Sequence, residues 1–99
     1  MEIVISKEVA DWYKDELHLK DGDAIRFFVR YGGVGGNIPG FSLGVNVEKQ
    51  KKPHKTVSIS NIDFFVEESD VWYFEDQDLH VNLDETLNEP IFSYVSNND

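Results

Sequence analysis

The stretch that decides the fold is 24–48, AIRFFVRYGGVGGNIPGFSLGVNVE, in which two alternating apolar runs flank a glycine-rich loop. Alternation with a period of two predicts a half-buried β-strand over Ala24–Tyr31. One face of that strand carries Ile25, Phe27, Val29 and Tyr31. Phe41–Glu48 repeats the pattern, so we predict that the two segments pair as strands around the loop.

Toward the N-terminus, the sequence predicts a short strand followed by one helix. Glu2–Ile5 is a short apolar run, and Ser6 after it is a residue type that caps helix N-termini. Lys20–Asp23 contains the residues that end the helix. The predicted buried face of the helix carries residues at helical spacing, namely Val9, Trp12, Tyr13 and Leu17.

Toward the C-terminus, the pattern predicts further strands separated by turns. The aromatic cluster Val71–Phe74 predicts a helical turn or tight corner within 67–78. The predicted strands are Thr56–Ser60, Ile62–Val66, Asp78–Asp84 and Ile91–Val95. The segments expected to be irregular are the basic turn Lys49–Lys55, the loop Glu85–Pro90 and the polar tail Ser96–Asp99.

These elements predict a mainly β fold with an N-terminal helix, in one domain over 1–99. A chain of 99 residues is too short for two separate cores, and its 40% hydrophobic content is sufficient for one. Residues 1–22 form the strand and helix, 24–95 the β core and 96–99 the tail. There is no repeat or low-complexity segment.

The charge distribution limits the classes of partner. The net charge is −10, and all 9 lysines and arginines lie within residues 1–55, so the second half is acidic. An acidic surface repels phosphate backbones and anionic lipid, which predicts no nucleic-acid or membrane partner. The chain has no apolar run near the roughly 20 residues of a membrane helix and no signal-peptide pattern. We therefore expect a cytoplasmic protein.

Two cations around an aromatic ring form an unusual stripe, Arg26, Phe28 and Arg30, on the second face of the first long strand. Arginine offers paired donors to carboxylates, so the stripe is a candidate recognition face for an anionic group or an acidic protein partner. The alternative is cross-strand pairing with the acidic second half of the chain, which we favour.

The glycine loop is the second candidate for partner binding, through Gly33, Gly35 and Gly36. It does not match a dinucleotide-binding motif, because Ile38 occupies the position of the last glycine and no helix is predicted to follow. The simpler interpretation is an irregular loop whose glycines adopt positive backbone angles.

Polar side chains on the predicted strand 78–84 are weak candidates for metal ligands. Asp78 and His80 would face the same way about 7 Å apart, with Asp84 near the strand end. Such groups can bind divalent or ferric ions, although alternating polar residues also occur on any exposed strand face. No nucleophile motif is present, so we predict no catalytic residue and no enzyme.

The order of these segments resembles the HesB-like domain of A-type iron–sulfur carriers, in particular its divergent YneR-type branch. The resemblance rests on IRFFVRYGG, GFSLGVNVE, IDFFVEESDVWYF, DLHVNLDE and EPIFSY. It implies a partly open β barrel or sandwich. The family binds iron or a cluster through a loop cysteine and a Cys-Gly-Cys near the C-terminus. Here the loop position falls on Val34 or Ile38, and the chain contains no cysteine.

The sequence therefore predicts a carrier scaffold that lacks its cluster-binding thiolates and holds no cofactor. We expect a non-enzymatic accessory or binding module with a protein partner, linked to iron–sulfur metabolism by association. The alternative is a metal- or ligand-binding protein that uses aspartate, glutamate and histidine. A free strand edge would also allow a homo-oligomer.

Overall fold

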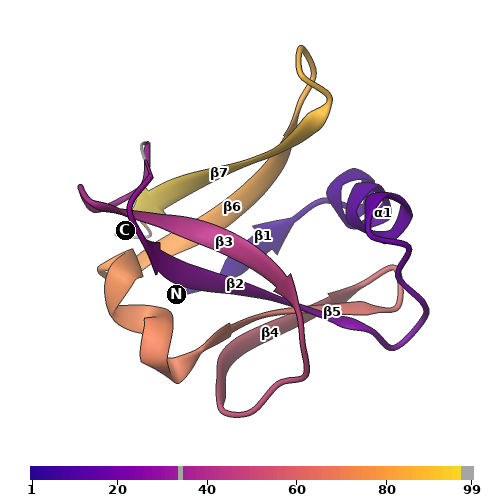
Figure 1. Ribbon diagram of the computed structural model, residues 1–99, viewed down its shortest axis with the longest axis horizontal. Coiled ribbons are helices and arrows are strands. Elements are labelled where there is room, and N and C mark those ends of the chain that lie inside the picture. The colour runs from indigo at the N-terminus through magenta and orange to yellow at the C-terminus, as the bar shows by residue number, and fades with distance from the viewer. Residues whose placement is uncertain (34, 97–99) are drawn as a thin grey trace.

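The computed structural model describes residues 1–33 and 35–96, which form seven strands, one α-helix and one 3-10 helix (Figure 1). The predicted fold class, mainly β with an N-terminal helix, is confirmed. In chain order the elements are β1 Ile3–Ile5, α1 Lys7–Glu16, β2 Ala24–Tyr31, β3 Phe41–Val47, β4 Pro53–Ile59, β5 Ile62–Glu67, η1 Glu68–Phe74, β6 Gln77–Asp84 and β7 Glu89–Ser96.

Two open sheets build the fold. The four-stranded sheet has the order β3-β2-β5-β4, and the three-stranded sheet has the order β1-β6-β7 (Figure 1). The predicted pairing of the first two long strands is confirmed, because β2 runs antiparallel to β3 with Tyr31 opposite Phe41. Phe27 of β2 stacks on Phe64 of β5 and meets the edge of Phe92 from β7. The core therefore lies between the two sheets.

Helix α1 begins as predicted and ends slightly earlier. The Ser6 Oγ accepts a hydrogen bond from the Val9 backbone N–H at 3.2 Å, which satisfies one of the unpaired donors of the first turn. Val9 and Tyr13 are buried against the sheets. The prediction that Leu17 shares this buried face is wrong: Leu17 is the C-terminal cap and is 40% exposed, because the helical turn has ended before it.

Two strands begin two or three residues earlier than predicted, and in both a proline had suggested a loop. Strand β4 begins at Pro53 rather than at Thr56, and β7 begins at Glu89 and includes Pro90. Proline lacks a backbone donor and is tolerated on edge strands, where one row of donors needs no partner. Both β4 and β7 are edge strands. Because β7 also extends through Ser96, that residue belongs to the core sheet and not to the tail.

The aromatic cluster forms a helical turn, as predicted. In η1, Tyr73 and Phe74 are fully buried, and Trp72 lies at the edge of the core with half its surface exposed. The buried Asp70 accepts hydrogen bonds from the Arg26 guanidinium at 2.8 Å and the Val29 backbone N–H at 3.4 Å. Asp70 thus attaches η1 to β2.

Candidate partner-binding surface

The loop between β2 and β3 is anchored at its base and near its tip. The Gly32 backbone N–H donates to the Gly40 carbonyl at 2.7 Å, which closes the base. Near the tip, the Asn37 backbone N–H donates to the Tyr73 Oη at 2.7 Å and the Asn37 Nδ2 donates to the Tyr73 carbonyl at 2.8 Å. Because Tyr73 is fully buried in η1, these bonds connect an exposed loop to the core.

Two of the glycines are required by close packing. A Cβ at Gly36 would overlap the Phe41 carbonyl oxygen and the Tyr73 Oη. A Cβ at Gly33 would lie 2.5 Å from the Ser42 Oγ, and Gly33 also has a φ of +84°. Residues with a Cβ fit neither position without displacing a neighbour, so the irregular-loop interpretation accounts for these glycines without a bound anion.

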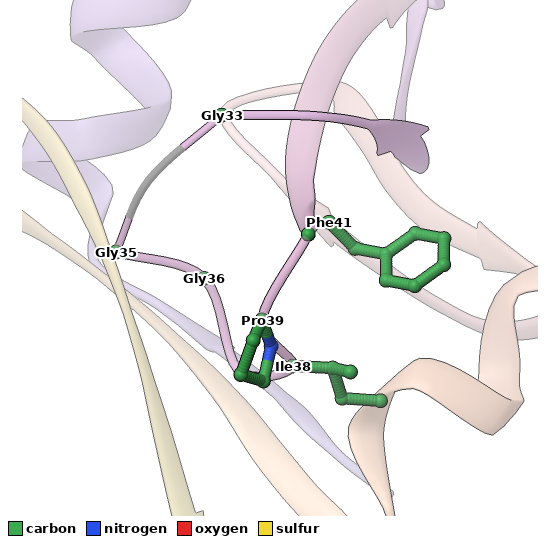
Figure 2. A pocket seen from close by; sticks show the side chains of 7 residues that line it. Gly33, Gly35, Gly36, Ile38, Pro39 and Phe41 are labelled. Carbon is green, nitrogen blue, oxygen red and sulfur yellow. The ribbon is translucent and has the colours of Figure 1, made fainter.

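A small cavity of about 330 Å³ lies within the turn of the loop. Its lining residues include Gly36, Ile38 and Phe41, and Figure 2 shows the chain turning from Gly35 through Gly36 and Pro39 back to Phe41. Ile38, one of the two positions where the resemblance places the family's loop cysteine, points with Phe41 to the same side of the loop (Figure 2). The other position, Val34, lies outside the described residues.

A row of aromatic rings, here called the aromatic ridge, lies beside this loop and consists of Tyr31, the half-buried Phe41 and Trp72. Tyr31 is 90% exposed and Trp72 is 50% exposed, with Phe41 between them. The ring centroids of Tyr31 and Phe41 are 5.4 Å apart, and those of Phe41 and Trp72 are 5.3 Å apart, both edge to face. Such contacts hold large apolar surfaces in place in the free protein.

The two arginines of the stripe have different surroundings. Arg26 forms ion pairs with Glu48 at 3.1 Å and with Asp70 at 2.8 Å, and its guanidinium lies over the Phe28 ring at 5.9 Å. Only Asp70 comes from the acidic second half of the chain. Arg30, in contrast, is exposed and donates from Nε to the Ser42 Oγ at 2.9 Å.

The ion pairs of Arg26 shift the pKa values of Arg26 and Glu48. Burial by itself lowers the pKa of Arg26, but the hydrogen bonds to Asp70 and Glu48 outweigh it and raise that pKa. The pKa of Glu48 is lowered, because Asn46 and Arg26 donate hydrogen bonds to its carboxylate. Arg26 is thus committed to the fold and offers little to a partner.

The three weak metal candidates do not form a cluster. The Asp78 Oδ1 accepts from the Glu2 backbone N–H at 2.7 Å, whereas the Asp84 Oδ1 accepts from the Thr86 backbone N–H at 2.8 Å. They lie six residues apart along β6, a separation of about 20 Å in a strand. His80 lies between them, opposite Ser93. Among residues 1–33 and 35–96, no three histidines or acids are grouped closely enough to hold a metal ion.

Sequence reasoning missed the aromatic ridge as a surface. Tyr31 shares the strand face of the buried Ile25 and Phe27, as predicted, yet it is exposed because burial decreases toward the end of β2. A partial signal was present, since Tyr31 directly precedes Gly32 at the point where the strand pattern ends.

In the part of the chain that the structure describes, no helix is long and apolar enough to span a membrane.

Comparison with known proteins identifies relatives along nearly the whole chain. A pyruvate dehydrogenase inhibitor of Bacillus subtilis is 46% identical over 94 residues, which cover 95% of this chain and 99% of that protein. An uncharacterised protein of Staphylococcus saprophyticus is 37% identical over 90% of this chain and 94% of its own length. One of Staphylococcus aureus is 36% identical over 84% and 88%. No family model matches the chain.

The fold and the surface first define a class: a small, mainly β domain with one helix, two open sheets and an exposed aromatic ridge of the kind found at protein interfaces. The relatives then define the family. The chain belongs to the family that includes the Bacillus subtilis pyruvate dehydrogenase inhibitor.

Proposed function

We propose that this protein is a non-enzymatic regulator that inhibits pyruvate dehydrogenase by binding to it. The observation that carries the proposal is the similarity to a protein named pyruvate dehydrogenase inhibitor, which extends over 95% of this chain and 99% of that relative. The match therefore covers nearly all of the protein that carries this name. A binding role also agrees with the absence of a nucleophile motif in the sequence.

The surface that we assign to this binding is the aromatic ridge together with the glycine loop. Tyrosine and tryptophan are enriched among the residues that dominate protein–protein affinity, and both are exposed here. Their rings contact Phe41, and Asn37 of the loop is hydrogen-bonded to the buried Tyr73, so these contacts restrain the described part of the surface in the free protein. Preorganised side chains lose less conformational entropy on binding.

The scaffold itself is part of the proposal. We assign the fold to the HesB-like type on the basis of its segment order, with the cluster-binding thiolates absent from this chain. An association with iron–sulfur metabolism, and a cytoplasmic location, remain predictions from the sequence.

Titration of purified pyruvate dehydrogenase from the source organism tests the proposed function. The measured quantity is the initial rate of NADH formation as increasing amounts of this protein are added. A binding inhibitor should reduce the rate in proportion to complex formed, without a time lag, and dilution should restore activity. An unchanged rate at a large molar excess would refute inhibition. Progressive inactivation by trace amounts that dilution does not reverse would instead identify an enzyme.

A further inference from the structure

A second pocket lies between an edge strand of one sheet and an edge strand of the other. Strand β3 is the outer strand of one sheet and β7 the outer strand of the other, and residues of both line a cavity of about 320 Å³. We call it the seam pocket. Its lining includes apolar side chains, Leu43, Ile91 and Phe92, and three polar ones, Arg30, Ser42 and Tyr94.

Arg30 is the only charged residue among the described residues that line the seam pocket. Its Nε donates to the Ser42 Oγ at 2.9 Å, and Ser42 is itself buried. This bond engages Nε, and the described residues give the two terminal nitrogens of Arg30 no hydrogen-bond or ion-pair partner. Arg26 differs, because two carboxylates neutralise it. The pocket therefore offers one positive charge with a paired donor edge.

Tyr94 supplies a second donor. The Tyr73 Oη accepts from the Asn37 backbone N–H, and Tyr73 is fully buried, so its own hydroxyl proton must find an acceptor nearby. The Tyr94 Oη lies 3.5 Å away and is the acceptor that the described residues provide. With that arrangement, the Tyr94 proton is free to point into the seam pocket. Burial raises the pKa of Tyr94, which keeps the hydroxyl protonated.

We propose that the seam pocket binds a small monocarboxylate with a short apolar body, whose carboxylate lies between Arg30 and Tyr94 and whose apolar end contacts Leu43 and Phe92. Planar carboxylates match the paired donors of a guanidinium. A single negative charge balances the single arginine, whereas a phosphate dianion would leave excess charge in a protein of net charge −10. The proposal goes beyond the proposed function, and it is tested on the isolated protein.

Ligand binding would also connect to the glycine loop. The donors form a chain from the Asn37 N–H through Tyr73 and Tyr94 to the bound carboxylate. Hydrogen bonds in such a chain polarise and strengthen one another. An occupied seam pocket should therefore protect the Asn37 amide from hydrogen exchange more than an empty pocket does.

Titration followed by NMR tests the proposal, with isobutyrate as the probe, isobutyramide as its neutral isostere and inorganic phosphate as the competing anion, all at constant ionic strength. Isobutyrate should cause saturating shifts at β7 and the loop with a Kd on the order of 1 mM, a value expected for so small a ligand. Isobutyramide should cause none.

Variants assign the contacts. Arg30→Gln should weaken isobutyrate binding at least roughly tenfold, because it removes the positive charge and the paired donors. Tyr94→Phe should weaken it several-fold, because it removes one hydroxyl donor. Arg30 is exposed, so its variant is expected to fold, and the dispersion of the NMR spectrum checks that. The proposal is overturned if isobutyrate shows no saturation, if isobutyramide or phosphate binds as tightly, or if both variants bind like the wild type.

Discussion

Replacing Asp70 by alanine probes the contact on which the aromatic ridge depends. Asp70 joins η1, which carries Trp72, to Arg26 and to the Val29 backbone N–H of β2. Its side chain is 10% exposed, so the pair with Arg26 is poorly screened by solvent. Removal leaves a partly buried cation with only Glu48 and an amide without its acceptor. We expect a loss of about 2–4 kcal/mol in the free energy of unfolding.

Urea denaturation and thermal melting measure this loss, which corresponds to roughly 10–20 °C in Tm for a domain of this size. The matched control is Glu48→Gln, which removes the charge of the other partner of Arg26 but touches no backbone amide. Because Glu48→Gln keeps an amide oxygen that can still accept from Arg26, this variant should lose less than about 1 kcal/mol. Equal losses in the two variants, or a loss below about 1 kcal/mol for Asp70→Ala, would show that Asp70 does not hold η1 in place.

Three further predictions concern the glycine loop, the carboxylate of Glu48 and the absence of cysteine. Gly36→Ala should destabilise the protein by about 1–3 kcal/mol and shift the NMR signals of Tyr73, because the added Cβ overlaps the Tyr73 hydroxyl. The control is Gly40→Ala, where only the positive φ is unfavourable, and it should leave the Tyr73 signals unchanged. Stability should decrease on acidification below about pH 4.5, because the lowered pKa of Glu48 means that the folded state binds fewer protons than the unfolded state. Urea denaturation at a series of pH values from neutral to about pH 3 measures this decrease. If a Glu48→Gln variant shows the same dependence of stability on pH, Glu48 is not its cause. Anaerobic incubation with iron and sulfide should produce no charge-transfer bands in the visible spectrum, since the chain has no cysteine, and a stable coloured cluster on the isolated protein would contradict this.

The strand pattern could be predicted where burial alternates along a single segment. The pairing of β2 with β3 follows from two matched runs on either side of one loop. The parallel pairing of β1 with β6 joins Ile3 to Leu79 across most of the chain, and nothing local indicates it. The starts of β4 and β7 were hidden by Pro53 and Pro90, because the tolerance for proline depends on a strand being at an edge.

The candidate surface could be predicted only in part. Glycines 33, 35 and 36 marked the loop, but its attachment to Tyr73 lies 36 residues away in sequence. The different roles of Arg26 and Arg30 could not be predicted either, since both lie on the same face of one strand between apolar residues. What separates them is Asp70, which is 44 residues from Arg26. Contacts of this kind depend on the packing of η1 against β2 and have no local signature.

The most direct test of the central claim is the affinity of this protein for pyruvate dehydrogenase, compared between a ridge variant and a matched control. The ridge variant is Tyr31→Ala with Trp72→Ala. The control is Val47→Ala with Leu87→Ala, which also removes exposed apolar side chains, 48% and 63% exposed. Val47 pairs with Ile25 at the opposite end of β2 and β3 from the ridge, and Leu87 lies in the turn between β6 and β7. The account predicts that the ridge variant raises the Kd at least roughly 30-fold and that the control leaves it within about twofold. Equal affinities of the two variants would contradict the assignment of the ridge as the binding surface.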